Sequence, residues 1–502
     1  MRHRLHLLIG LLCLAVSPIL TRAGPADLPW VYSTYLGSES EDLGAGIVVD
    51  ARGRATAAGF TSGTNFPTER RPTAPQHGVD VFATRFEPDG AAISFSYWFN
   101  ALTLFAEDEG YAIALDPQGN VYVTGYTRSD DFCTVFGAVP GFSPTYFGET
   151  DAFVLKIRAD GSGLDYCTFL GGSDWDVGRA IAVDDAGRAI VVGGTWSNDF
   201  PTTPGAVQPA LADLRDTFLV KLDVHGTALL YSTFLGGTGQ EDAVGVQVVA
   251  SGAIHVTGWT NSSDFPVTAG VLGPVYRGNT DGFLYQLDPT GHRLVYSTYL
   301  GGSGEDRPAA LALLGSQPVI AGVTRSPDFP TTPGVLSPTP IGGQDAFVAR
   351  VLPGGSALGF ATYLGGSGDD WAWALQPGAD GNLLIAGATA STDFPITAGA
   401  LSTARRGERD ATLVQLAANG AYLAYGTYLG GNDVDQARGV ALDHGGDVLL
   451  TGSTSSADFP ITPGAFDTTY NGGGDIFVVR LRLATVVPPF GPRLYLPLLR
   501  HN

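Results

Sequence analysis

Aspartate recurs through this sequence at fixed positions, where its carboxylate has the chemistry to hold a loop or a cation. Twenty of the 49 acidic residues fall into three series. The series are Asp42, Asp108, Asp176, Asp242, Asp306, Asp370 and Asp435; then Asp131, Asp199, Asp264, Asp328, Asp393 and Asp458; then Asp80, Asp151, Asp216, Asp281, Asp345, Asp410 and Asp475. Short carboxylates accept backbone N–H groups in turns, so we expect most of them to stabilise loops.

Calcium binding is the alternative use of these aspartates, because oxygen-rich loops bind hard cations. Asp174 with Asp176, and Asp433 with Asp435, come nearest to a calcium-binding loop. Neither shows the full spaced pattern Asp-x-Asp-x-Asp-Gly. We therefore expect no obligatory cofactor, with Ca²⁺ as the one that the sequence leaves open.

Tryptophan and arginine occur at positions that differ between copies of a repeat described below. The residues that we single out are Trp175, Trp196, Trp259, Trp371, Trp373, Arg179 and Arg307, with Arg128, Arg325 and Arg438 interspersed. Exposed tryptophan beside arginine and aspartate is typical of a surface that binds sugar or peptide. The alternative is that these indoles fill space between neighbouring units of the repeat.

Catalytic motifs are not found in the sequence. The histidines form no spaced metal pair, and neither a Gly-x-Ser-x-Gly motif nor a phosphate-binding glycine loop occurs. We expect binding rather than catalysis. A carboxylate pair assembled from distant loops, as in a lyase or glycosidase, stays open.

Two cysteines, Cys133 and Cys167, lie within one copy of the repeat, where the other copies have mostly proline and serine. Paired departures in an exported protein predict a disulfide closing a loop of 34 residues. Two buried free thiols are the alternative, since the sequence does not give their separation in space.

A repeat of about 65 residues carries all of these groups. The phrase Tyr-Ser-Thr-Tyr-Leu-Gly and its variants begin at Tyr32, Phe95, Tyr166, Tyr231, Tyr296, Phe360 and Tyr425. Each copy holds four strand-like runs joined by turn residues, the pattern of antiparallel hairpins. Seven such units predict an all-β fold, a seven-bladed β-propeller with four antiparallel strands per blade.

The two ends of the repeat array predict a closed ring. The array opens with a lone fourth strand at residues 30–36, and its last strand, 476–481, is a third one. The N-terminal strand is therefore expected to complete the last blade. The loops that carry the aspartates should share one face of the ring, and the tight hairpin turns should lie on the other.

Residues outside the array predict export. Residues 1–23 resemble a cleaved signal peptide, with Arg2 and Arg4 before an apolar stretch. An N-terminal membrane anchor is the alternative, but the apolar run is short and is broken by Pro18. We expect a short leader at 24–29, the propeller at 30–482 and a C-terminal tail at 483–502, with no membrane span once the signal is removed.

The chain is acidic, with 28 basic and 49 acidic residues and a net charge of −21. Such a charge repels nucleic acid and anionic membranes. It suits a soluble protein that meets cations, neutral sugars or basic partners. We expect a monomer whose partner is an extracellular protein or carbohydrate.

The motifs recur together and in order, and in this respect the chain resembles the bacterial seven-bladed β-propeller repeat proteins called SBBP repeat proteins. Its copies contain Tyr-Ser-Thr-Tyr-Leu-Gly-Gly, Val-Tyr-Val-Thr-Gly, Asp-Phe-Pro-Thr-Thr-Pro-Gly and Asp-Ala-Phe-Val. The resemblance implies a secreted or surface propeller and assigns no catalytic residues.

Taken together, the sequence predicts a secreted or cell-surface binding scaffold that takes its ligand on the acidic loop face. Two alternatives stay open. One is a propeller lyase or hydrolase acting on extracellular polysaccharide or peptide. The other is a structural component of a surface layer.

Overall fold

The computed structural model describes residues 29–68, 78–99, 106–134, 137–143 and 145–483. The expected signal peptide at 1–23, all but the last residue of the leader, and all but the first residue of the tail lie outside these ranges. Within them no helix is long and apolar enough to cross a membrane.

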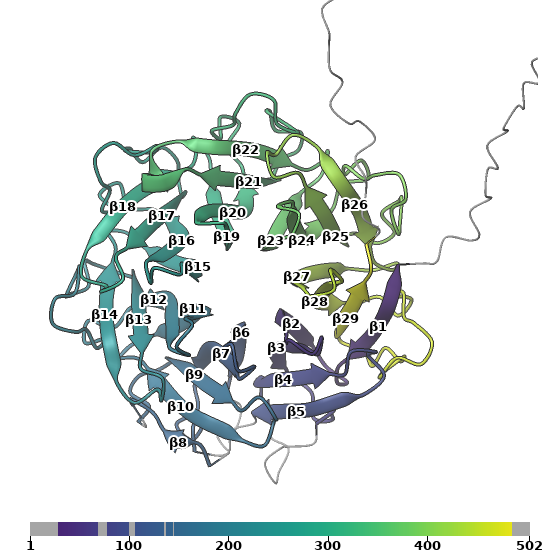
Figure 1. Cartoon of the computed structure of the whole chain (residues 1–502), viewed down its shortest axis with the longest axis horizontal. Coiled ribbons are helices and arrows are strands. Elements are labelled where there is room, and N and C mark those ends of the chain that lie inside the picture. Colours follow the sequence, from purple (N-terminus) through teal and green to yellow (C-terminus); the bar gives the residue numbers. More distant parts are fainter. Residues whose placement is uncertain (1–28, 69–77, 100–105, 135–136, 144, 484–502) are drawn as a thin grey trace, which may run out of the picture.

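Seven sheets surround a central axis, each built on four antiparallel strands, as predicted (Figure 1). In six of them these four strands follow sequence order from the axis outwards, and in the seventh β1 is the outermost strand. The inner strands are β2 (Asp42–Val49), β6 (Glu109–Leu115), β11 (Asp176–Val183), β15 (Glu241–Val248), β19 (Asp306–Leu314), β23 (Asp370–Pro377) and β27 (Asp435–Leu442). The second strands are β3 (Ala55–Thr61), β7 (Val121–Thr127), β12 (Ala189–Thr195), β16 (Ile254–Thr260), β20 (Gln317–Thr324), β24 (Leu383–Thr389) and β28 (Val448–Thr454).

The outer half of each blade is equally regular. The third strands are β4 (Asp80–Phe86), β9 (Asp151–Ile157), β13 (Asp216–Leu222), β17 (Asp281–Leu287), β21 (Asp345–Val351), β25 (Asp410–Leu416) and β29 (Asp475–Leu481). The fourth strands are β5 (Ile93–Phe99), β10 (Leu164–Leu170), β14 (Leu229–Leu235), β18 (Leu294–Leu300), β22 (Leu358–Leu364), β26 (Leu423–Leu429) and β1 (Trp30–Leu36). We number the blades from the one that β2 opens, so that β6 opens blade 2 and β27 opens blade 7. Blade 2 adds β8 (Val139–Pro140), and a short 3₁₀ turn, η1 (Pro353–Gly355), precedes β22.

The ring closes as predicted, because β1 pairs antiparallel with β29. The register runs from Trp30 opposite Leu481 to Leu36 opposite Ile476. Blade 7 is therefore made of β27, β28, β29 and β1, and the two edges that an open array would expose are paired with each other.

Every inner strand carries a β-bulge at the same place. The extra residue is Ala45, Tyr111, Arg179, Val244, Ala309, Trp373 or Arg438. A bulge redirects a side chain and often lies beside a functional site. A cavity of about 210 Å³ follows the axis and is lined by all seven inner strands, with Tyr111, Val244 and Trp373 among its residues.

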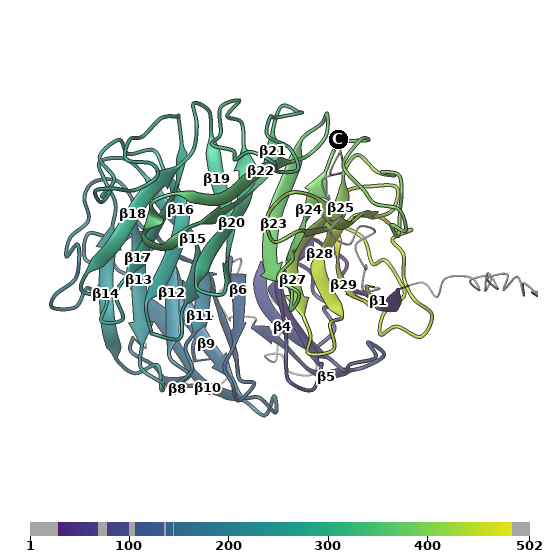
Figure 2. The same ribbon diagram turned by 45° about the horizontal axis from the view of Figure 1, so that its top comes forward.

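The long loops are held by buried phenylalanines. In these loops, most of which contain Asp-Phe-Pro, the ring of one phenylalanine lies 4.5–4.9 Å, centroid to centroid, from the phenylalanine of the third strand. The loop residues are Phe66, Phe132, Phe200, Phe265, Phe329 and Phe459. All six are 2–3 % exposed. The tilted view shows the blades side by side, with the connecting loops gathered at the ends (Figure 2).

Candidate functional site

The first series of aspartates lies at the start of the inner strands and is buried there. Asp176, for example, is fully buried and accepts the Gly172 N–H at 2.7 Å and the Ser197 hydroxyl at 2.8 Å. Burial raises the pKa of this carboxyl to about 7. It therefore fastens the loop that enters its own strand.

The third series lies across the blade interface from the first. Asp345, at the start of β21, accepts the Ile341 N–H at 2.9 Å, and Asp370 of the next blade accepts the Gly366 N–H at 2.7 Å. A Cβ on Gly365 would lie 2.3 Å from Asp345 Oδ1 and 2.6 Å from Asp370 Oδ2. One buried carboxyl pair therefore sits at this interface, with a glycine between its members.

These positions correct the expectation of a strongly acidic loop face. All fourteen aspartates of the first and third series are at most 5 % exposed. Several have a pKa raised by burial, to about 6 for Asp42 and Asp370 and about 7 for Asp435 and Asp475. The charge on the solvent-facing surface of this face is therefore much smaller than the residue count implies.

Asp242 is the member of the first series whose role differs. In blade 4 the loop is held by Glu241, which accepts the Gly237 N–H at 3.0 Å and the Thr260 hydroxyl at 2.6 Å. Asp242 is one residue further on and forms ion pairs with Arg179 and Arg215. Because Glu241 holds the loop in the way that the aspartate does in other blades, Asp242 is available to form ion pairs with arginine.

The second series is exposed, except for the half-buried Asp131, and stabilises the loops. Asp199 accepts the Ser173 N–H at 2.8 Å, and Asp264, Asp328 and Asp393 do the same for Thr238, Ser303 and Ser367. The carboxylates of Asp174 and Asp433 each accept the N–H of the following residue. Within the described part of the chain no three ligating side chains converge as a metal site would require.

Tryptophan and arginine form a first stack over blades 2 to 5. The guanidinium of Arg128 lies 5.2 Å from the Trp175 ring, and Trp175 meets Trp196 edge to face at 6.1 Å. Arg215 follows, 4.2 Å from Trp196 and 5.5 Å from Trp259, and Arg307 lies 4.6 Å from Trp259. Cation–π contacts fix these long side chains against rigid rings.

Each arginine of the first stack has a carboxylate partner. Arg128 donates to Glu107 at 2.6 Å, and Arg307 donates to Glu305 at 2.6 Å. Arg325 also pairs with Glu305, and Arg179 and Arg215 both pair with Asp242. Arg179 also lies 4.7 Å from the ring of Tyr111 at the axial cavity.

A second stack occupies blades 6 and 7. Trp371 and Trp373 of β23 stack at 5.8 Å with 24° between their planes. Arg409 lies 4.0 Å from Trp371, and Arg438 lies 4.0 Å from Trp373. Trp373 and Arg438 are the bulge residues of neighbouring inner strands, so the stack spans a blade interface at the axis.

The five tryptophans and two arginines proposed as ligand contacts therefore lie in the two stacks or next to them. Arg215 and Arg409 belong to the stacks but did not emerge from the sequence. Both directly precede the aspartate that opens a third strand, where other copies have residues such as Thr150, Thr280 and Gln344. The same comparison of copies that selected the tryptophans would have found them.

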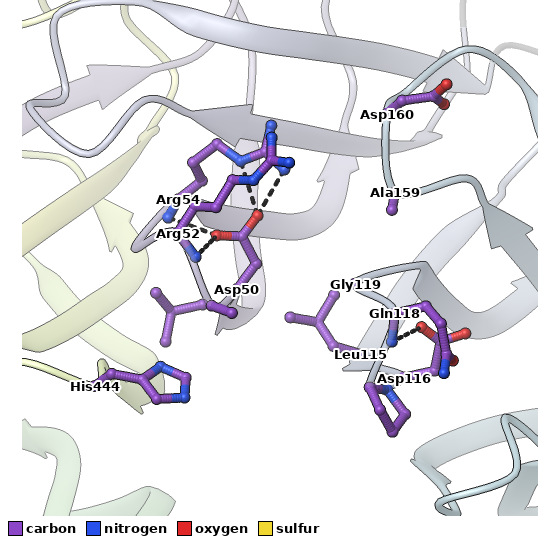
Figure 3. A pocket seen from close by; sticks show the side chains of 13 residues that line it. Asp50, Arg52, Arg54, Leu115, Asp116, Gln118, Gly119, Ala159, Asp160 and His444 are labelled. Atoms are coloured by element: carbon purple, nitrogen blue, oxygen red, sulfur yellow. Dashed lines mark hydrogen bonds and ion pairs between the residues drawn. The ribbon is translucent and has the colours of Figure 1, made fainter.

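The hairpin-turn face carries a separate hollow of about 550 Å³ between the turns of blades 1, 2 and 7 (Figure 3). Asp50 accepts the Arg52 N–H at 2.9 Å and the Arg54 Nε–H at 2.8 Å, and Asp116 accepts the Gln118 N–H at 3.0 Å. These carboxylates thus stabilise their own hairpins.

In blade 2, Cys133 and Cys167 are joined as a disulfide, with their Cα atoms 5.2 Å apart. Both are buried. The bond ties the long loop of the blade to its outer strand, β10.

Comparison with protein families finds one match. The family model described as SBBP, β-propeller repeat, matches residues 103–132 and 424–460. None of the curated proteins matches the chain.

Several solved structures align over most of the chain at low identity. The WD40 β-propeller domain of Doa1 has a TM-score of 0.45 at 9 % identity, covering 91 % of this chain and 98 % of its own. Hydrazine synthase of Kuenenia stuttgartiensis gives 0.43 at 10 %, with 93 % and 99 % covered. The endosialidase of phage phi92 gives 0.43 at 11 %, with 95 % and 72 % covered.

Proposed function

Because the chain is a seven-bladed β-propeller with SBBP repeats, we propose that it is a secreted binding protein whose ligand is held by the two tryptophan–arginine stacks around the axis. The observation that carries the proposal is the gathering of five of the seven tryptophans into these stacks. They occupy the positions at which the blades differ from one another.

The stacks have the properties of a recognition surface. Trp175 is 39 % exposed, and Trp196, Trp259, Trp371 and Trp373 are half-buried. Their rings are held in place by guanidinium groups, so little side-chain entropy is lost when a ligand is bound. Amphipathic indoles beside charged donors suit an extracellular carbohydrate or protein.

Export supports the same proposal. The N-terminal segment has the composition of a signal peptide, and the Cys133–Cys167 disulfide suits an oxidising compartment. N-terminal sequencing of the mature protein tests this point, with cleavage expected after residue 23. Retention of the segment in a membrane fraction would favour an anchored protein.

The proposal is tested by measuring binding of the mature chain to a panel of glycans and peptides through tryptophan fluorescence and calorimetry. Trp259→Ala should weaken a bound ligand by an order of magnitude or more, as loss of a buried aromatic contact does. Trp30→Phe, in β1, is the matched control and should bind normally. Equal binding by both variants would contradict the assignment.

The two alternatives give different outcomes in that experiment. Turnover of a panel glycan or peptide, abolished by one carboxylate substitution, would identify an enzyme. Ordered assembly of the purified chain without any ligand would identify a surface-layer component. A monomer that binds and does not turn over its ligand supports the scaffold.

A further inference from the structure

The second stack differs from the first in its charge. Within the described residues, neither Arg409 nor Arg438 forms an ion pair, whereas Arg128, Arg179, Arg215 and Arg307 each have one. The Nε atoms of Arg409 and Arg438 are buried and have no hydrogen-bond partner in the structure, which is also true of Arg215 Nε, so the ion pair of Arg215 is what distinguishes the first stack. Two guanidinium groups are therefore left without a counter-charge at one blade interface.

The surroundings of the second stack do not supply that counter-charge. Arg438 donates to the Gln436 side chain, a neutral acceptor, at 2.8 Å. Asp369 and Glu408 are the carboxylates that act on Arg409, but both are exposed and neither is within ion-pair distance of it. Two further arginines, Arg405 and Arg406, precede Arg409 in the same loop.

The electrostatic balance of the pair agrees with this geometry. Burial, followed by repulsion from Arg409, lowers the pKa of Arg438 to about 10. Burial also lowers the pKa of Arg409. A chain with a net charge of −21 would neutralise such a pair easily, and it does so in the first stack, so the missing carboxylate is a specific feature of blades 6 and 7.

The stack also restricts how a ligand can be bound. Trp371 and Trp373 lie against each other, and each has a guanidinium 4.0 Å from its ring. A neutral sugar that needs a free indole face finds much of that surface covered. Apart from the Arg438 Nη2–H that donates to Gln436, the N–H groups of the two guanidiniums have no acceptor among the described residues, and a planar fork of this kind matches the oxygens of a carboxylate, sulfate or phosphate.

We propose that Arg409 and Arg438, held by Trp371 and Trp373, form an oxyanion-binding subsite that receives the acidic group of an extracellular carbohydrate. This inference rests on the proposed function and names the ligand class for one of its two stacks.

Exposed carboxylates beside the stack select for a sparsely charged ligand. A dense polyanion such as nucleic acid would be repelled by Asp369 and Glu408. A carbohydrate with isolated acidic groups places one anion between the arginines and keeps the rest of its surface neutral. The carboxylate of a uronic acid is the simplest such group.

The test is calorimetric titration of the mature protein with glucuronate and, in parallel, with methyl glucoside. Glucuronate should bind and methyl glucoside should bind at least tenfold more weakly, with the difference shrinking as salt is added. Inorganic sulfate and phosphate distinguish the acidic group used, and an acidic peptide distinguishes carbohydrate from protein. A preference for the peptide over every acidic sugar would overturn the assignment of ligand class.

Two variants and one control locate the subsite. Arg438→Gln and Arg409→Gln should each weaken glucuronate binding about tenfold or more, since each removes a charge-assisted contact. Arg158→Gln, which removes an exposed arginine paired with Asp165 in the hairpin between β9 and β10, should leave it unchanged. Unchanged binding by both second-stack variants, with melting temperatures near that of the parent, would overturn the proposal.

A gain of binding provides an independent check. Asp242→Asn removes the carboxylate that Arg179 and Arg215 share and leaves two unbalanced guanidinium groups in the first stack. This variant should acquire a second site for glucuronate.

The two proposals can fail separately. If the parent protein binds neutral glycans but neither glucuronate nor any other anion, the oxyanion subsite is contradicted and the proposed binding function is kept. If it binds anions at the second stack but no glycan, the proposed binding function is contradicted and the anion-binding subsite is kept.

Discussion

A single glycine shows how closely the residues at a blade interface are fitted. Gly365 follows β22, and its Cα faces the carboxyl groups of Asp345 and Asp370. Both are buried and are held by backbone N–H groups, so neither is free to move aside. The glycine of this phrase is therefore required by proximity to two side chains rather than by backbone conformation.

Gly365→Ala should destabilise the protein by about 1–3 kcal/mol, the cost of forcing an extra methyl group into a filled site. Thermal unfolding monitored by circular dichroism measures the change. Gly343→Ala is the matched control, because the nearest atom to its added Cβ would be Asp369 Oδ1 at 3.5 Å, an ordinary contact. Equal melting temperatures for the two variants would contradict this account.

At this scale the sequence predicted residue types better than their environments. The selected tryptophans and arginines do come together, because residues that differ between copies of a repeat mark where the blades differ. That most of the repeated aspartates are buried could not be read from the sequence, since their burial depends on contacts between neighbouring blades. The role of Asp242 was missed because Glu241 beside it is an equally plausible start for β15.

At the scale of the element, the buried carboxyl pairs make stability depend on pH. Asp216 and Asp475 have their pKa raised to about 7, and Asp151 and Asp281 to about 6, by burial and, for all but Asp151, by neighbouring carboxylates. An unfolded aspartate has a pKa of about 3.9. The folded chain therefore binds these protons more tightly, and the stability that they contribute is lost as the pH rises through about 4 to 7.

The melting temperature should accordingly increase when the pH is lowered from 8 to about 5.5, as measured by calorimetry at constant ionic strength. Asp475→Asn should flatten the dependence by removing one titrating group, and Asp160→Asn, on the surface, should not. The second series opposes this trend only at lower pH, because hydrogen bonds from loop N–H groups lower the pKa of Asp199 and Asp393. A melting temperature that falls steadily from pH 8 to 5.5 would contradict the prediction.

The disulfide belongs to the same scale, because it ties the long loop of blade 2 to β10. Mass spectrometry should find no alkylated thiol at Cys133 or Cys167 before reduction and two after it. Cys133→Ser with Cys167→Ser should lower the free energy of unfolding by about 2–4 kcal/mol, as loss of a bridge of this kind does. Two alkylated thiols without reduction would end this assignment.

At the scale of the whole molecule, β1 determines whether the ring is closed. Deletion of residues 24–36 removes the partner of β29 and leaves blade 7 with three strands and a free edge. The truncated protein should melt at a lower temperature and should self-associate, as unpaired edges do. Size-exclusion chromatography and thermal unfolding measure both effects.

A permuted chain is the control for that deletion. Moving residues 30–36 to the position after β29, through a short linker, restores the same pairing with a different connection. It should recover the melting temperature and the monomeric state. The role of β1 would be contradicted if the deleted chain had the melting temperature and monomeric state of the parent and the permuted chain did not.

The overall fold could be predicted from the sequence because a period of about 65 residues fixes the unit, and the unmatched strands at 30–36 and 476–481 fix the closure. The same strand pattern occurs in seven equivalent units, so one irregular copy, such as residues 95–110, does not obscure the fold. The ligand site carries no such repetition, since it consists of the positions where the copies disagree. Its geometry therefore had to come from the structure.

The strand that closes the ring is also the first part of the propeller that a ribosome makes. Blades 1 to 6 are each contiguous in sequence, so each can form soon after its own residues emerge. β1 has no partner until residues 475–481 have been synthesised, and its edge stays open throughout translation. A chain that stops early keeps two open edges, whereas a finished chain pairs both in one step, so closure itself distinguishes complete molecules from truncated ones.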